Sequence, residues 1–201
     1  MWNYLTDRSY TFGGDMDIRE LDRRVLELIG GVIDGLTDEQ FDVPTPCEGW
    51  TVREVIRHMV GNSLGVLARV GGTEAPAEVD LGVDPRATFR QTRADASAAL
   101  SRPEVFDGPW ELRGQQYTGG TMLFVHFADV LVHTWDIGTA VGIDIRFEDD
   151  LAQAALGVVS RFPEDAWGPG SAFIEKLPVA DDASAQEKLL ALTGRRVPSA
   201  A

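Results

Sequence analysis

Four residues that could take part in metal or acid–base chemistry lie within one apolar stretch, from Gly119 to Gly142. The stretch is long enough for about six helical turns. On a helix, His126, Asp129 and His133 are spaced i, i+3 and i+7, so they fall within an arc of roughly 60°. A carboxylate one turn before an inward-facing histidine suits a divalent metal. The alternative is structural: hydrogen-bonded core histidines and an Asp129–His133 ion pair would leave the same pattern.

The chain has three histidines, and the third, His58, lies on another predicted helix. That helix begins at Thr51 with a T-V-R-E capping box and runs to about Val70. His58 lies about 140° from the centre of its apolar stripe. It is therefore a surface histidine or part of a second contact face. Gly61 and Gly65 on the same side favour a contact face, because glycines let another helix come close.

The sequence as a whole predicts an all-α fold. Apolar periodicity predicts further helices at residues 17–36, 84–101, 147–161 and 184–193. Residues 102–118 are expected to be irregular or to form a short hairpin, and strand-like alternation is otherwise nearly absent. The sequence thus predicts an N-terminal extension over residues 1–15, followed by one helical domain with a C-terminal tail over residues 16–201.

Composition narrows the classes of function. The chain has 201 residues and a formal net charge of −14, which disfavours nucleic acid and anionic membrane surfaces as partners. We see no transmembrane span and no signal peptide. A single cysteine, Cys47, excludes an internal disulfide framework, so we expect a cytoplasmic protein. We interpret Cys47 as a small buried apolar residue.

The predicted third helix carries a basic flank formed by Arg86, Arg90 and Arg93. In so acidic a chain this flank could hold an anionic ligand. The alternative is a flank that is simply solvated.

Three blocks of sequence resemble one known family. The stretch PTPCEGWTVREVIRHMVGN (residues 44–62) resembles the maleylpyruvate isomerase N-terminal type of the DinB/YfiT-like superfamily, and VLVHTWDIGTAVG (residues 130–142) resembles a second block of it. The tail ADDASAQEKLLALTGRRV (residues 180–197) is similar to the ending of one metal-binding branch. The resemblance implies an up-down-down-up four-helix bundle with short additional C-terminal helices.

The resemblance also implies a divalent metal held by His58, Asp129 and His133. Where relatives commonly have Glu or His, this chain has the shorter Asp129. His126 would be a fourth ligand or a partner of a ligand, and Asp136 would orient a ligating histidine. Imidazole and carboxylate favour zinc, with nickel, iron and manganese as alternatives.

Two classes of function stay open from the sequence. The first is a metal-dependent enzyme that uses a low-molecular-weight thiol, such as a mycothiol-type S-transferase or isomerase, with a small-molecule substrate. The second is a non-enzymatic, stress-related module with a structural metal site, and a bundle without metal is a third interpretation. The resemblance implies that homodimers are common, and the aromatic residues of segment 1–15 could form an exchanged arm of a homodimer.

Overall fold

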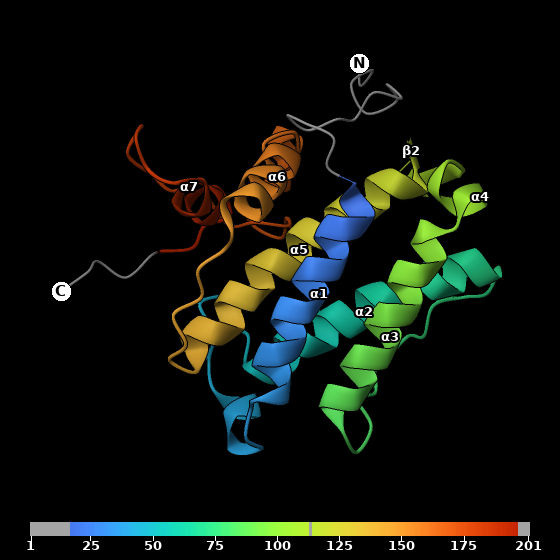
Figure 1. Cartoon of the computed structure of the whole chain (residues 1–201), viewed down its shortest axis with the longest axis horizontal. Coiled ribbons are helices and arrows are strands. Elements are labelled where there is room, and N and C mark those ends of the chain that lie inside the picture. Colours follow the sequence, from blue (N-terminus) through green and yellow to red (C-terminus); the bar gives the residue numbers. More distant parts are fainter. Residues whose placement is uncertain (1–16, 113, 197–201) are drawn as a thin grey trace.

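The computed structural model of the protein describes residues 17–112 and 114–196. Figure 1 shows a helical molecule. The described residues contain one sheet, of two short antiparallel strands. In chain order the elements are α1 (Ile18–Asp34), η1 (Glu39–Asp42), α2 (Val52–Gly71), α3 (Pro85–Ser101), α4 (Pro103–Phe106), β1 (Pro109–Leu112), β2 (Gln115–Thr118), α5 (Gly119–Ala140), α6 (Asp149–Val159), η2 (Glu164–Ala166) and α7 (Ala185–Leu192). The predicted all-α fold is confirmed, while the up-down-down-up order stays a prediction.

The main helices begin where the sequence supplies side-chain caps. Asp17 caps α1, and Asp84 caps α3 with a proline following at its first position. Thr51 and Glu54 form both hydrogen bonds of a capping box at α2. These local signals explain why the predicted helices agree with the observed ones to within a few residues.

The core forms around α5, which packs against α1, α2 and α3. Figure 1 shows α1 lying beside α5, with α2 and α3 on the side away from α6. Most residues of α5 are buried, including Leu123, Phe127 and Leu131. A helix that is apolar all round must be covered on all sides. Any polar side chain on α5 therefore needs a partner or a cavity.

The last third of the chain packs against α5 through α6. Helices α6 and α7 pack on each other, and α6 packs on α5. The side chain of Gln186 joins α7 to the loop that precedes α6. It accepts from the Phe147 amide at 2.9 Å and donates to the Ile145 carbonyl at 2.8 Å. After α7, Gly194 takes a positive φ of 79° and turns the chain so that Arg195 is buried.

The basic flank of α3 faces α1 and its following turn. Arg86 donates to the Leu36 carbonyl and pairs with Asp38, and Arg90 pairs with Asp34. Neither expectation for the flank describes its third member, Arg93, because it is 1% exposed.

Arg93 forms a buried ion pair with Asp22 of α1 at 2.6 Å. Its Nε and Nη1 atoms are buried without a hydrogen-bond partner. Arg90 and Arg93 therefore join α3 to α1. The solvated interpretation holds for the exposed Arg90 and is wrong for the buried Arg93, while an anionic ligand on this flank stays a prediction.

Two further expectations concern membrane-spanning helices and the N-terminal segment. No helix within residues 17–112 and 114–196 is long and apolar enough to cross a membrane. The predicted extension over residues 1–15 and its role as an exchanged arm lie outside the described residues, so both stay predictions.

Candidate metal centre

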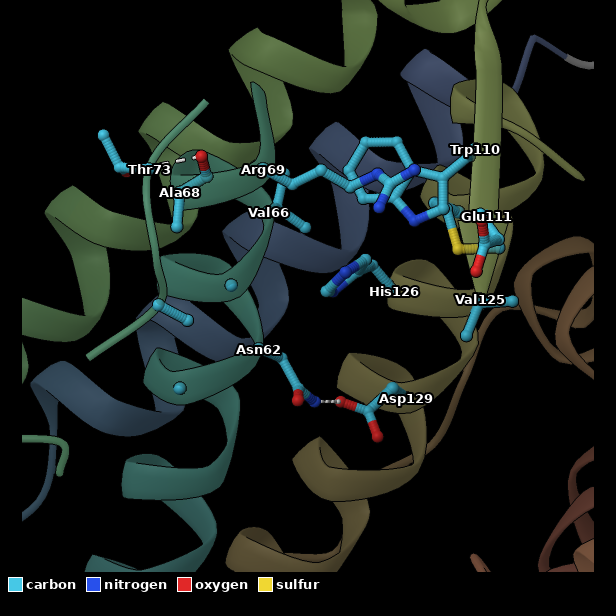
Figure 2. Close-up of a pocket in the computed structure, with 14 residues that line it drawn as sticks. Asn62, Val66, Ala68, Arg69, Thr73, Trp110, Glu111, Val125, His126 and Asp129 are labelled. Carbon is cyan, nitrogen blue, oxygen red and sulfur yellow. Dashed lines mark hydrogen bonds between the residues drawn. The ribbon is translucent and has the colours of Figure 1, made fainter. Parts of the chain in front are cut away.

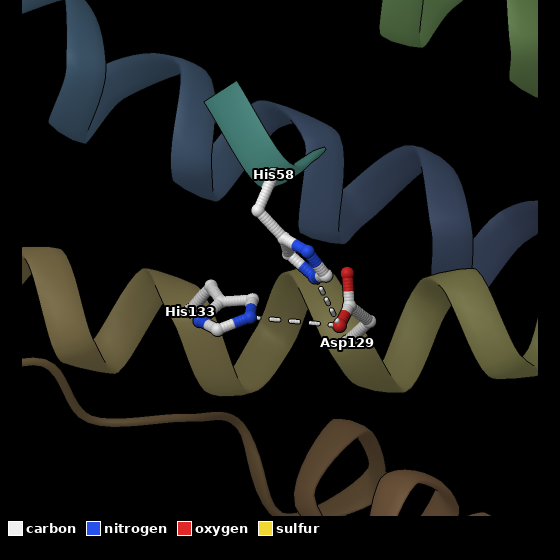
Figure 3. Close-up of side chains that lie close together, drawn as sticks. All are labelled: His58, Asp129 and His133. Atoms are coloured by element: carbon white, nitrogen blue, oxygen red, sulfur yellow. Dashed lines mark hydrogen bonds and ion pairs between the residues drawn. The ribbon is translucent and has the colours of Figure 1, made fainter. Parts of the chain in front are cut away.

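Three ligand-type side chains from two helices meet at one point (Figure 3). His58 comes from α2, and Asp129 and His133 come from successive turns of α5. His58 Nε2 lies 3.3 Å from Asp129 Oδ1, and His133 Nε2 lies 3.5 Å from the same oxygen. The structure thus brings together the three residues that the sequence singles out, with donor atoms all within 4.8 Å of one another.

The donor set and spacing fit a divalent metal. Two atoms that bind one zinc ion at tetrahedral angles lie about 3.3–3.5 Å apart, given bond lengths of roughly 2.0–2.2 Å. The two N···O separations match that range. Two imidazoles and one carboxylate are also a common protein ligand set for zinc.

The charges within the cluster favour the ionised carboxylate that a metal requires. Burial raises the pKa of Asp129, but the charge of His133 and the hydrogen bond with His58 outweigh it and lower the pKa overall. Burial likewise lowers the pKa of His58, but Asp129 offsets this and the net pKa is raised. Asp129 therefore carries a negative charge at neutral pH.

His133 is held from behind by a buried ion pair. Its Nδ1 donates to Asp136 Oδ2 at 2.9 Å. An ionised carboxylate only accepts, so this bond places a proton on Nδ1 and turns Nε2 toward Asp129. Arg195 in turn donates to both oxygens of Asp136, at 2.8 and 3.1 Å. Burial raises the pKa of Asp136, but His133 and Arg195 lower it overall.

Two other side chains contact the cluster. Asn62, one turn after His58, places its amide nitrogen 3.1 Å from His58 Nε2 and donates to Asp129 Oδ2 at 3.3 Å. Trp50 stacks on His133 with ring centroids 6.1 Å apart and lies 5.0 Å from His58. The indole thus covers one side of both imidazoles.

A cavity begins at Asn62 and Asp129 and runs between α2 and α5 (Figure 2). Its volume is about 630 Å³, within the roughly 300–1,000 Å³ of typical ligand pockets. His58 lies on a second contact face of α2, as one of the two expectations had it, because it faces Asp129 of α5. The glycines do not bring another helix close: both line this cavity. A Cβ added at Gly65 would meet no atom within 4 Å, and one at Gly61 would meet Val79 of the following loop at 3.2 Å.

His126 lies on the cavity wall and is not part of the three-residue cluster. Figure 2 shows its ring projecting from α5 toward α2. Burial and the nearby charge of Arg93 lower its pKa to about 3. His126 is therefore a neutral imidazole at physiological pH.

Cys47 is half-buried and packs against the core. Burial raises the pKa of its thiol. A thiol with a raised pKa is a poor nucleophile at neutral pH, in keeping with its interpretation as a small packing residue.

Comparison with known proteins supplies the family. The model of the mycothiol maleylpyruvate isomerase N-terminal domain matches residues 23–138, more than half of the chain. The chain belongs to this family. His58, Asp129 and His133 lie inside the matched family segment, whereas Arg195 lies beyond it.

Two curated proteins and one solved structure are also similar to this chain, and the two curated proteins have no described activity. Two uncharacterized proteins of Mycobacterium tuberculosis, from strains CDC 1551 / Oshkosh and ATCC 25618 / H37Rv, are each 24% identical over 90% of this chain and 100% of their own. A crystal structure of a mutant mycothiol-dependent maleylpyruvate isomerase matches with a TM-score of 0.57 and 15% identity. That match covers 71% of this chain and 66% of the solved chain, so the chain spans less than two thirds of that enzyme. At this identity the likeness shows the fold.

Sequence reasoning missed Asn62 and Arg195 as parts of the site. Asn62 had a usable signal, because it follows His58 by four residues on one helix. Arg195 lies in the tail that resembles a metal-binding branch, but nothing local indicates its pairing with Asp136, 59 residues away.

Proposed function

We propose that this protein is a metal-dependent enzyme that uses a low-molecular-weight thiol of the mycothiol type, as an S-transferase or an isomerase. The observation that carries the proposal is the convergence of His58, Asp129 and His133 at the edge of a cavity. Zinc is the first expectation for the metal, with nickel, iron and manganese as alternatives. The thiol is inferred from the family to which the chain belongs.

Each side chain of the site has a part in this proposal. A metal bound by the three residues would lower the pKa of a bound thiol or water and so supply a nucleophile at neutral pH. Asp136 fixes the ring of His133 and directs its Nε2 to the metal position. Trp50 limits the access of water to the two imidazoles. His126, neutral on the cavity wall, can exchange a hydrogen bond with a bound substrate but is too weak a base to take its proton at neutral pH.

The alternative is a non-enzymatic, stress-related module with a structural metal site. Structural zinc sites are closed by four protein ligands, whereas catalytic sites keep a position open. Three donors beside a cavity, with His126 outside the cluster, support the open kind of site.

Metal analysis of the purified full chain tests the proposal. We expect about one metal ion per chain, lost in His58→Ala and in His133→Ala. His126→Gln is the matched control and keeps the metal. In cobalt-loaded protein, added mycothiol should produce a thiolate-to-cobalt charge-transfer band that His58→Ala abolishes. A protein that binds no metal under any loading condition would overturn the proposal.

A further inference from the structure

The cavity continues away from the metal cluster along one face of α2. Asn62, Gly65 and Arg69 are spaced i, i+3 and i+7, so they share a face. Seven residues of helix rise about 10 Å. The cavity is therefore long enough to place two ends of one ligand in different surroundings.

The far end of the cavity presents a cation, Arg69, with the exposed Glu111 also on its lining. Arg69 lies there with its guanidinium carbon 4.8 Å from the centroid of the Trp110 ring, and Figure 2 shows the two side chains next to each other. Trp110 is 8% exposed, so its ring is a fixed platform. Among residues 17–112 and 114–196, no carboxylate forms an ion pair with Arg69, although most arginines of this acidic chain are paired.

The walls between the two ends are largely apolar. Val66 and Ala68 come from α2, and Met122 and Val125 come from α5. Gly65 widens the passage, because it presents no side chain and has open space before it. A flat apolar group fits such walls, and a cation held on an indole favours a carboxylate at its end.

We propose that the cavity binds a small molecule with a flat apolar body and a terminal carboxylate, with the carboxylate on Arg69 and the body beside Trp110. The other end of the molecule would reach the cluster at Asp129, and this last point rests on the proposed function. The carboxylate subsite itself stands about two helical turns away and needs no metal. In this proposal, Arg69 determines whether the cavity prefers an anionic or a neutral ligand.

Two matched probes test the subsite: 4-phenylbutanoate and the neutral 4-phenylbutan-1-ol. Their affinities are measured by calorimetry on the full chain, both as purified and after metal removal. We expect the acid to bind about tenfold more tightly than the alcohol. Arg69→Met should abolish this preference and Arg69→Lys should keep part of it. Arg57→Met, an exposed arginine on the same helix but outside the cavity, should leave it unchanged.

Gly65→Leu places a side chain in the passage and should weaken both probes together. Equal binding of acid and alcohol would overturn the proposal, as would a preference that survives in Arg69→Met. Absence of binding by both probes would overturn it as well. Because the preference is measured with and without metal, its failure is distinct from a failure of metal binding at His58, Asp129 and His133.

Discussion

The two histidines of α5 are buried in opposite ways. His133 has a charged partner, Asp136, which is itself neutralised by Arg195 in a fully packed layer. His126, two turns earlier, faces a cavity, and burial together with Arg93 lowers its pKa to about 3. The Nδ1 side of His133 is thus packed and paired, and we call this part of α5 the closed end. His126 faces the cavity and is uncharged, and we call its surroundings the open end.

This difference shows how one apolar helix can hold two kinds of polar chemistry. A buried charge is tolerated when it is paired and hydrogen-bonded, and an unpaired buried group loses its charge instead. The closed end fixes the orientation of a metal ligand, whereas the open end leaves room for a ligand. The C-terminal helices α6 and α7 create the closed end, since they dock on one another and on α5 and so bring Arg195, which follows α7, against Asp136.

Of the substitutions that we consider, removal of the Arg195 side chain should destabilise the protein most. Arg195→Met leaves Asp136 buried without its cation, which costs about 3–5 kcal/mol in the free energy of unfolding. Urea denaturation at pH 7 measures the loss. The neighbouring Arg196→Met is the control: its pair with Glu175 is exposed, so its loss should cost about 0–1 kcal/mol. Equal effects of the two variants would mean that burial of the Asp136 pair contributes nothing.

Alanine substitutions at two glycines, one at each end, should change the stability of the protein in opposite directions because of packing alone. A Cβ at Gly138 would clash with the side chain of Ile145. We therefore expect Gly138→Ala to destabilise the protein by about 1–3 kcal/mol through overpacking. Gly65→Ala meets open space and should stabilise the helix by up to about 1 kcal/mol. Thermal unfolding of both variants checks this, and opposite signs of the change are the decisive result.

The sequence predicted the helices and the histidines of the site, but not the pairing at the closed end or the cavity at the open end. Helix caps and apolar periodicity located α2 and α5, and the scarcity of histidines pointed to His58 and His133, because those signals are local. Arg195 could not be predicted, since its pairing depends on how α6 and α7 dock. The glycines of α2 were misjudged for a similar reason: absence of a side chain is compatible with close helix contact and with a cavity, and only the packed structure distinguishes them.

Acid should reveal the neutral state of His126, and this is the smallest effect we expect. A histidine whose folded pKa lies near 3, below the ordinary value of about 6.5, binds its proton more readily in the unfolded chain. Its stabilising contribution is therefore present above pH 6.5 and declines as the pH falls from about 6.5 toward 3. Between pH 7 and 5.5 the decline amounts to about 1 kcal/mol.

The variant His126→Gln does not titrate, so the difference in unfolding free energy between it and the parent isolates this contribution. The other groups near the ring, Arg93, Asp129 and His58, are present in both proteins and largely cancel. We expect the parent to lose stability relative to the variant on acidification, measured by urea unfolding at several pH values. Parallel curves would show that His126 titrates normally. The open end of α5 would then hold a charged imidazole in mild acid, and the contrast with His133 would disappear.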